Sequence, residues 1–383
     1  MPPFTSSSFS LSFSLSFSLS FSLSFSYPGS SSRTRTRSRR SRICRLTAPP
    51  RLPGGRRPNH TPRMSKCLVT GAAGFIGSHL VDALIARGHT VVGVDNLKLG
   101  RRDNNAKALA TGQFKFYEAD VNDLAAMRRA LEAEGGDGAY EMAWHLAANS
   151  DIRAGVTNPD VDLRDTFMTT FNLLKVMKDF SIKRIAFAST SAIYGEHPAR
   201  LSEDIGPLFP ISNYGAMKLA SEAIISTALQ TILTRAWIFR FPNVVGSRST
   251  HGAIYDFVQK LKRNKAELEV LGDGTQEKPY FHVADLVEAM LYIVDTAAEH
   301  LAFYNIGTSD SLTTVRYMAD AVVKRVSPGA KINYTGGSRG WIGDVPRFQY
   351  SVEKLKRLGW SPRLTSNEAV DRSVNEVATE QGL

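Results

Sequence analysis

Short apolar runs alternate along this chain with longer segments in which apolar residues recur every three or four positions. The apolar runs predict strands at 67–70, 90–94, 114–119, 141–148, 184–189 and 237–241. Apolar residues at 80, 81, 84 and 85 predict a helix over 78–85, and further helical segments follow near 160–180 and 213–232. This alternation is typical of an α/β fold in which helices cover both faces of a doubly wound parallel sheet.

The first 63 residues do not follow this pattern. A Ser-Leu-Ser-Phe repeat over 8–26 places Ser at every second position, so it lacks the ~20 consecutive apolar residues of a membrane span. An Arg-, Ser- and Thr-rich stretch without acidic residues follows. This composition is typical of an organelle transit peptide; the alternative is a mis-assigned start. Met64 stands directly before a predicted strand, which favours the second interpretation. Under either interpretation the fold occupies 64–383.

The net charge of +11 comes from this leader. Residues 1–63 contain eleven Arg and no Lys, Asp or Glu, so the remaining 320 residues hold 36 basic and 36 acidic side chains. A neutral domain has no basic field to steer it to DNA or RNA. Cys44 and Cys67 are the two cysteines, which excludes a disulfide framework or a zinc cluster of cysteines.

A glycine-rich turn joins the first predicted strand to the first predicted helix. Gly71, Gly74 and Gly77 are spaced Gly-x-x-Gly-x-x-Gly, and the second strand ends at Asp95, twenty-four residues after Gly71. Glycines let backbone N–H groups approach a pyrophosphate, and a helix N-terminus attracts its charge. A carboxylate at the end of the second strand accepts hydrogen bonds from a ribose diol and repels a 2′-phosphate. The sequence therefore predicts a dinucleotide site that prefers NAD to NADP.

The glycine spacing resembles that of the extended short-chain dehydrogenase/reductase superfamily, which implies a Rossmann-type sheet. The resemblance also implies cofactor contacts from the turn and from the ends of the next strands. The residues at those places are Gly71, Gly74, Phe75, Ile76, Gly77, Asp95, Asn96, Asp120, Val121, Ala147 and Ala148. His145 lies just before the last pair. Because no second ligand has suitable spacing, we expect His145 to be packed at a strand end and expect no metal.

Tyr214 and Lys218 are spaced i, i+4 at the start of a predicted helix, so they share one face. A phenol with a pKa near 10 is a poor base at pH 7. An adjacent ammonium and a positive nicotinamide ring favour the phenolate, and a decrease of ~3 pKa units requires ~4 kcal/mol. The same spacing is common in helices without catalytic function, so this pair is not sufficient evidence by itself.

The segment before this helix supports a catalytic function for Tyr214 and Lys218. Ser189-Thr190-Ser191 before Tyr194-Gly195 resembles the hydroxyl-rich strand end of the superfamily. Matched residue by residue, the catalytic hydroxyl is Thr190, with Ser189 and Ser191 as nearby alternatives and Tyr194 as a wall of the sugar pocket. The resemblance therefore implies Thr190, Tyr214 and Lys218 as catalytic residues, of which Tyr214 and Lys218 also contact the cofactor.

The C-terminal half resembles the substrate-binding lobe of the NAD-dependent epimerase/dehydratase family, and the whole of 64–377 is most similar to enzymes of the UDP-glucose 4-epimerase type. Matching positions imply substrate contacts from Asn243, Lys278, Tyr280, Arg339 and Asp344. The chain departs from the family pattern at three places. Lys278 stands for an Arg, Trp341 for a second Arg that Arg339 could replace, and Thr166 for a cofactor-contacting Asn. A Lys supplies a point charge but not the bidentate fork of an Arg.

The resemblance implies an NAD-binding core at about 64–240 plus 265–300 and a smaller substrate lobe, mainly 243–264 and 301–377. It implies C4 inversion of a UDP-hexose through a 4-keto sugar, with NAD bound throughout. Alternatives are a nucleotide-sugar 4,6-dehydratase, another NAD-dependent sugar-nucleotide enzyme, or a non-catalytic NAD- or RNA-binding relative. Ser191-Ala192 stand where a dehydratase has Asp-Glu. We further expect a cytoplasmic homodimer formed through the helices near 160–180 and 213–232, no membrane or nucleic-acid partner, and organelle import if the leader is genuine.

Overall fold

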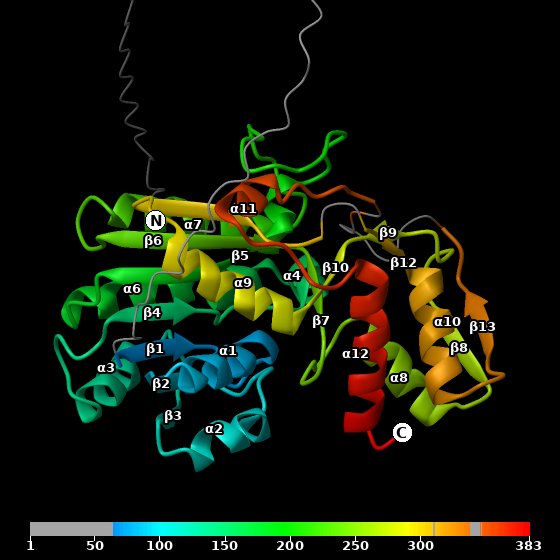
Figure 1. Ribbon diagram of the computed structural model, residues 1–383, viewed down its shortest axis with the longest axis horizontal. Coiled ribbons are helices and arrows are strands. Elements are labelled where there is room, and N and C mark those ends of the chain that lie inside the picture. Colours follow the sequence, from blue (N-terminus) through cyan, green and yellow to red (C-terminus); the bar gives the residue numbers. More distant parts are fainter. Residues whose placement is uncertain (1–63, 309–310, 338–344, 346) are drawn as a thin grey trace, which may run out of the picture. The chain divides into compact units, whose positions relative to one another are not determined.

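The computed structural model describes residues 64–308, 311–337, 345 and 347–383. A seven-stranded sheet forms its centre, with strand order β11-β6-β5-β4-β1-β2-β3 and every neighbouring pair parallel (Figure 1). The strands are β1 Lys66–Thr70, β2 Thr90–Asp95, β3 Phe114–Glu118, β4 Met142–His145, β5 Arg184–Thr190, β6 Arg235–Phe241 and β11 Leu301–Asn305. The predicted doubly wound Rossmann-type sheet is confirmed.

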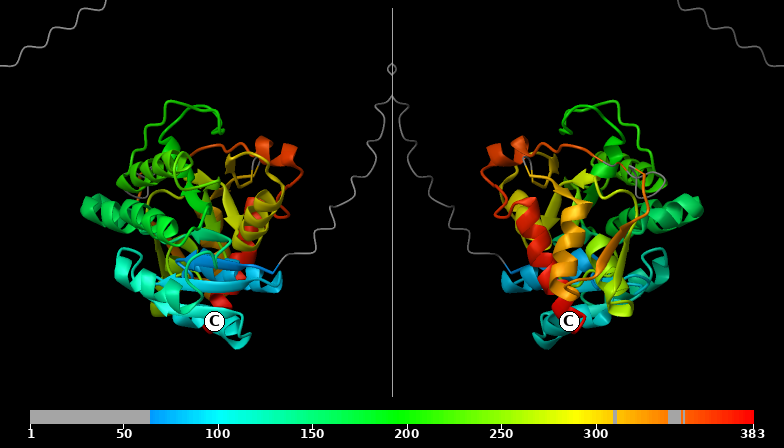
Figure 2. Two further views of the ribbon diagram at one scale, coloured as in Figure 1. Left: turned by 90° about the vertical axis from the view of Figure 1, so that its left-hand side faces the viewer. Right: turned by 90° about the vertical axis from the view of Figure 1, so that its right-hand side faces the viewer.

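Side-chain alternation along these strands builds two cores, one on each face. On β1, Cys67 and Val69 pack into one core and Leu68 into the other, and on β6 Trp237 and Ile238 divide in the same way. Figure 2 shows the sheet between green helices on one side and yellow α9 on the other. The first face is covered by α1 Phe75–Ala86 and α9 Val283–Thr296, and the second by α3 Leu124–Ala133, α6 Thr169–Asp179 and α7 Asn213–Ala228. Burial on both faces explains why these strands are apolar runs in the sequence.

Several predicted elements shift by a few residues. The first helix begins at Phe75 rather than 78, directly after the glycine turn. The fourth strand ends at His145 rather than 148, so Ala147 and Ala148 lie in the loop that follows it. The helix expected near 160–180 is divided into α5 Pro159–Asp162, the π-helical turn η2 Leu163–Met168, and α6. Such π turns are often found at functional sites.

Shorter helices fill the connections on the sheet's edges. They are η1 Arg102–Asn105, α2 Ala106–Ala110, α4 Ile152–Thr157, η3 Ser191–Tyr194 and α11 Glu353–Leu358. None of the helices in the described ranges combines the length and apolar character needed to cross a bilayer.

A smaller lobe has its own apolar core and lies to the right of the sheet in Figure 1. Its helices are α8 Ala253–Arg263, α10 Val315–Val326 and α12 Ser366–Glu380. Its paired strands are β13 Lys331–Tyr334 with β8 Glu267–Val270, β10 Tyr280–His282 with β7 Asn243–Val245, and β12 Thr313–Thr314 with β9 Glu277–Lys278.

These pairings correct the expected boundary between core and lobe. Strand β8 lies within 265–300, a range assigned to the core, yet it pairs with β13 of the lobe. Strand β11 begins at 301, in the range assigned to the lobe, yet it forms an edge of the central sheet beside β6. The chain therefore crosses between the two units, the core around the central sheet and the lobe, more often than a division by sequence ranges predicts. The reason is that strand pairing joins segments that are distant in sequence.

A polar cluster ties the two units together at the Ser247–Arg248 turn. On α12, Glu376 accepts bonds from His282 Nε2 at 3.1 Å and from the Ser247 backbone N–H at 3.0 Å. From α1, His79 Nε2 donates to the Ser247 carbonyl at 3.1 Å. The cluster therefore connects the first helix of the core with the last helix of the lobe.

The Glu376 carboxylate should make this connection sensitive to acid. Burial by itself would raise its pKa, but the bonds from His282 and Arg372 outweigh burial and lower the pKa from 4.5 to about 2. Because the folded-state pKa is depressed, the contribution is complete above pH ~4.5 and is lost as the pH falls toward 2. We expect Glu376→Gln to remove up to about 3 kcal/mol of unfolding free energy at pH 6, and much less near pH 3.

Denaturant unfolding of the wild type and of Glu376→Gln at several pH values measures the difference in their unfolding free energies. Glu380→Gln, which removes a neighbouring carboxylate bonded to the Arg248 backbone N–H, is the matched control. A destabilisation by Glu376→Gln that is the same at pH 3 and pH 6 would show that charge is not the cause.

Candidate active site

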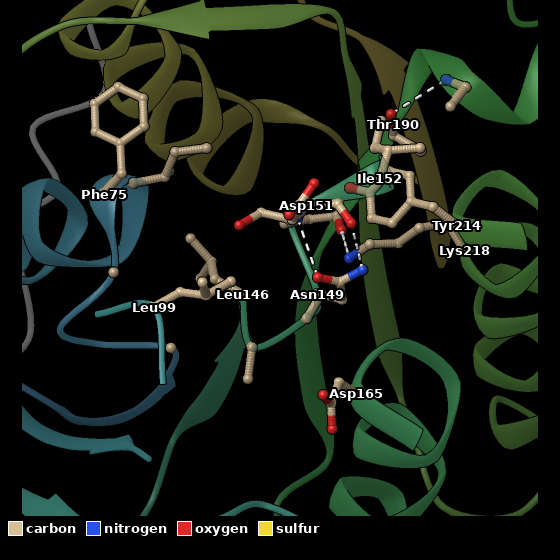
Figure 3. Close-up of a pocket in the computed structure, with 18 of the residues that line it drawn as sticks. Phe75, Leu99, Leu146, Asn149, Asp151, Ile152, Asp165, Thr190, Tyr214 and Lys218 are labelled. Carbon is tan, nitrogen blue, oxygen red and sulfur yellow. Dashed lines mark hydrogen bonds between the residues drawn. The ribbon is translucent and has the colours of Figure 1, made fainter. Parts of the chain in front are cut away.

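A cleft of about 590 Å³ runs along the carboxyl ends of the central strands and continues between the two units. All of the predicted cofactor residues line it, namely Gly71, Gly74, Phe75, Ile76, Gly77, Asp95, Asn96, Asp120, Val121, Ala147, Ala148, Tyr214 and Lys218. Thr190, Asn243 and Lys278 line it as well. Figure 3 shows the catalytic candidates Thr190, Tyr214 and Lys218 grouped on one side and Phe75 and Leu99 on the other.

Of the other predicted substrate residues, one is described by the structure and does not line the cleft. Tyr280 is buried in β10 and packs in the core of the lobe. Its position therefore does not support direct contact with a ligand. Arg339 and Asp344, together with Trp341, lie outside the described residues.

The glycine turn provides a cradle in which backbone must approach backbone. Gly71 has a φ of 72°, in the left-handed region that favours glycine. A Cβ at Gly77 would lie 1.9 Å from the Gly71 carbonyl oxygen, so a larger residue does not fit there. Helix α1 begins with Gly74 as its N-cap, and no side chain among the described residues caps it. Its first N–H groups therefore remain available for an anion, which fits the diphosphate of a dinucleotide.

Asp95 is held at the end of β2 by the backbone. Its Oδ2 accepts from Ala73 N at 3.0 Å and its Oδ1 from Leu97 N at 2.8 Å. Burial raises the pKa of this carboxyl, and the backbone N–H groups oppose the shift. A carboxylate has about four acceptor positions, more than these backbone N–H groups use, so capacity remains for a hydroxyl of a ribose. The position fits the adenosine side of a dinucleotide.

Two polar pairs beside Asp95 belong to the same end of the cleft. Asn96 Nδ2 donates to Asp120 Oδ2 at 3.2 Å. Lys98 and Asp165 form an ion pair at 2.5 Å, and both line the cleft. Sequence reasoning missed this pair, because Asp165 reaches the cleft only through the π turn η2, which the helical pattern does not reveal.

The three catalytic candidates come from adjacent elements. Thr190 is the last residue of β5, where its hydroxyl accepts from the Ala192 backbone N–H at 3.1 Å and lies close enough to Tyr214 to act on the pKa of the phenol. Lys218, one turn further along α7, donates to the Ala188 carbonyl at 2.7 Å and lies 5.9 Å from the centre of the Tyr214 ring. The predicted shared helix face is therefore present, and β5 brings the hydroxyl to it.

The electrostatics of this group correct one expectation. Burial raises the pKa of Tyr214; the Thr190 bond opposes the shift and the Asp162 charge adds to it. Burial also lowers the pKa of Lys218 to about 7, against the charges of Glu222 and Asp162. The lysine alone therefore does not lower the pKa of the tyrosine as expected. The part of that expectation that depends on a nicotinamide ring stays a prediction.

Ser189 and Tyr194, two other hydroxyl-bearing residues considered near the end of β5, do not line the cleft. Ser189 Oγ donates to Glu222 Oε1 at 2.5 Å, inside the core. Tyr194, expected as a pocket wall, is buried, receives a bond from Arg240 and donates to Asn305 Oδ1 at 2.8 Å. Ser191 does line the cleft. Within β5, Ser189 and Thr190 point to opposite faces of the sheet as strand geometry requires, whereas Ser191 and Tyr194 lie in the turn η3.

His145 is packed as expected at the end of its strand. Its Nδ1 lies 2.7 Å from Thr70 Oγ1 and its Nε2 lies 3.0 Å from Thr170 Oγ1. Burial lowers its pKa to about 3, so the ring is neutral. Within the described ranges no group of three or more His, Cys, Asp or Glu side chains is arranged to hold a metal ion.

Asn149 and Asp151 are cleft residues that sequence reasoning missed. They follow Ala147-Ala148 directly, which was a signal that the loop after the fourth strand continues along the site. Asn149 Nδ2 donates to the Asp151 carbonyl at 2.9 Å and to the buried Asp162 Oδ1 at 2.8 Å. Thr166, at the position of an expected Asn, accepts from the Asn149 backbone N–H at 3.2 Å and so supports the same loop.

Comparison with known proteins places these features in a family. Residues 67–307 match the NAD dependent epimerase/dehydratase family. UDP-glucose 4-epimerase of Lacticaseibacillus casei is 31% identical, over 77% of this chain and 91% of the relative. UDP-glucuronate 4-epimerase of Thermodesulfobacterium geofontis is 28% identical, over 82% and 96%. The crystal structure of Thermus thermophilus UDP-glucose 4-epimerase in complex with NAD superposes with a TM-score of 0.71 at 29% identity, covering 82% of this chain and 98% of that one.

We expect Asp95→Ala to weaken binding of NAD by about 10- to 100-fold, because it removes a charged hydrogen-bond acceptor. The gap between NAD and NADP should narrow, because the repulsion of a 2′-phosphate is lost as well. Asp95→Asn separates the two effects, since an amide oxygen can still accept one backbone bond without a charge. Titration of each variant with both cofactors, followed by fluorescence, provides the test. An unchanged ratio of the two affinities would remove Asp95 from the recognition of the ribose.

Proposed function

Because this chain belongs to the NAD dependent epimerase/dehydratase family, we propose that it is an NAD-dependent epimerase that inverts C4 of a UDP-hexose. The observation that carries the proposal is the group of Thr190, Tyr214 and Lys218 at one cleft with a dinucleotide cradle. The relatives include a UDP-glucose 4-epimerase and a UDP-glucuronate 4-epimerase, so the family relationship alone leaves the sugar open.

The proposed chemistry assigns one role to each of the three residues. The cleft residues would hold NAD, which when bound would supply a reversible hydride acceptor for C4 of the sugar. Tyr214 takes the proton of the C4 hydroxyl and later gives it back, and Thr190 hydrogen-bonds the same oxygen and the phenol. Lys218 is proposed to hold its amino group beside the tyrosine, 5.9 Å from the centre of the Tyr214 ring, through its hydrogen bond to the Ala188 carbonyl. Inversion at C4 would require the sugar to turn in the cleft, so that the hydride could be returned to its opposite face.

Asn243 and Lys278 are proposed to hold the nucleotide diphosphate while the sugar turns. Asn243 begins β7 and Lys278 ends β9, and both line the cleft on the side of the lobe. Arg339 and Asp344 remain candidates for the same role from sequence alone. Tyr280 is proposed to act through the packing of the lobe rather than by contact.

A 4,6-dehydratase is the rival within the family. Its elimination requires an acid next to the catalytic hydroxyl, whereas here Ser191 and Ala192 follow Thr190 and line the cleft. No carboxyl group therefore stands at that position to remove a proton from C5.

A homodimer is proposed through the surface of α5, η2 and α6. Leu163 in η2 is 47% exposed and Phe171 in α6 is 40% exposed, which is high for large apolar side chains. Apolar side chains gathered on one helical surface favour burial against a second copy.

We expect Tyr214→Phe to reduce kcat at least ~10³-fold, because it deletes the proton acceptor and little else. Bound NAD, measured by chromatography after denaturation, should stay at the wild-type level. Thr190→Val, which removes the other hydroxyl, serves as the comparison and should cost less. Near-normal turnover by Tyr214→Phe would assign the base to another residue.

Turnover in deuterated water separates the epimerase from the dehydratase. If hydride moves between C4 and one bound NAD, the hydrogen on C4 does not exchange with solvent. Once hydroxyl hydrogens are washed back, the mass of the product hexose should equal that obtained in ordinary water. Carbon-bound deuterium together with a 4-keto-6-deoxy product, detected by mass spectrometry and NMR, would contradict the proposed reaction.

A further inference from the structure

A carboxylate that the proposed reaction does not use lies in the cleft at its catalytic end. Asp151 is the N-cap of α4, and its Oδ1 accepts from the Arg153 backbone N–H at 3.1 Å. Its backbone is fixed on both sides by Asn149, which donates to the Asp151 carbonyl and accepts from the Asp151 N–H at 3.1 Å. The side chain lines the cleft and is therefore accessible to a ligand.

The position of Asp151 relative to Tyr214 is set by packing. Helix α4 packs on α7, and Asn213 Nδ2 donates to the Gly155 carbonyl at 2.9 Å. Asn213 is the residue before Tyr214, so the first turn of α7 is tied to the helix that Asp151 begins. Figure 3 shows Asp151 beside Asn149, between Phe75 and Leu99 on one side and Tyr214, Thr190 and Lys218 on the other.

Among the described residues, the basic groups beside this carboxylate are Arg153 and His251, and burial lowers the pKa of His251 against the opposing charge of Asp151. Arg153 Nε lies 3.9 Å from Asp151 Oδ1, its Nη2 lies 3.9 Å from Asp256, and its side chain is 55% exposed. Pairs of this length and exposure contribute little. Among the described residues, the recorded partners of the carboxylate are Arg153 N–H and the Arg153 guanidinium, both on Oδ1. Oδ2 therefore remains available to accept a hydrogen bond.

The chemistry of the sugar then distinguishes two classes of substrate. In a hexuronate the carboxylate is attached to C5, next to the reacting C4. A hexuronate whose C4 meets Tyr214 therefore brings a second negative charge near Asp151, where like charges repel. A neutral hexose presents hydroxyls instead, which a carboxylate binds strongly as donors.

We propose that Asp151 selects the substrate, accepting a hydroxyl of a neutral UDP-hexose and discriminating against a UDP-hexuronate. The proposal rests on the proposed function, and it makes Asp151 a specificity-determining residue rather than a participant in the proton transfer. It narrows the substrate class that the family relationship leaves open.

Calorimetry on the NAD-containing full chain tests the proposal by comparing the Kd of UDP-glucose with that of UDP-glucuronate. We expect the wild type to bind UDP-glucose at least about tenfold more tightly, which corresponds to about 1.4 kcal/mol. Asp151→Asn should bring the two constants within about threefold. Asn keeps the size and the N-cap bond, so the helix should be retained. Asp256→Asn is the matched control, since it removes the other carboxylate beside Arg153, and it should keep the wild-type ratio.

Two results would overturn the inference: equal affinities in the wild type, or a wild-type ratio in Asp151→Asn. Loss of discrimination in Asp256→Asn to the same extent would also overturn it, because a general change of charge would then explain the effect. If the NAD-containing wild type binds neither UDP-sugar, the proposed function itself is wrong. That outcome is distinct from one in which both sugars bind equally well.

Discussion

The structure depends on the constraint that parallel strands must be joined by crossovers that cover one face or the other. Leaving β1, the chain proceeds on one side to β2 and β3, whereas β4, β5, β6 and β11 lie on its other side. The order of strands therefore reverses beside β1, and the loops that leave β1 and β4 diverge. The crevice between such loops, at the carboxyl ends of the strands, is where ligands bind in sheets of this kind. Gly71, at the end of β1, and Ala147, after β4, both border it.

Buried polar groups hold the catalytic end of that crevice in place. Arg240 and Glu222 form a buried ion pair at 2.7 Å, and Ser189 and Tyr194 complete the hydrogen bonds around it. Removing one partner of such a pair is costly, because the other charge remains buried. The network joins β5, β6 and α7, the elements that position Thr190 and Lys218. The strand end that presents the reactive hydroxyl is thus supported from behind by charges that never reach the cleft.

Burial has a different consequence for the ionisable side chains that line the cleft. Desolvation raises the pKa of Tyr214 and lowers that of Lys218, so in both cases it favours the neutral form. Asp162, buried near them, also has a raised pKa because of its burial. A site with such shifts responds strongly to any charge placed in it, which makes the carboxyl groups of Asp95 and Asp151, both in the cleft lining, important for its electrostatics. Asn243 and Lys278 of the lobe border the cleft, and the Glu376 cluster is one of the polar connections between the lobe and the sheet.

The fold and the cofactor cradle could be predicted from the sequence because they depend on local patterns. Apolar runs specify strands buried on both faces, and the spacing of Gly71, Gly74 and Gly77 reports a backbone approach that side chains would block. Asp95, Tyr214 and Lys218 followed from their positions in these elements. Tertiary structure decided what depends on neighbours distant in sequence. It turned Ser189 and Tyr194 into the core, and it moved Tyr280 away from the cleft. It assigned β8 to the lobe and β11 to the central sheet, and it brought Asp151 into the cleft. The direction of a side chain, its burial and the compensation of its charge depend on contacts between segments that are distant in the chain. Local sequence patterns do not record those contacts, so these properties are decided by the packing of the folded protein.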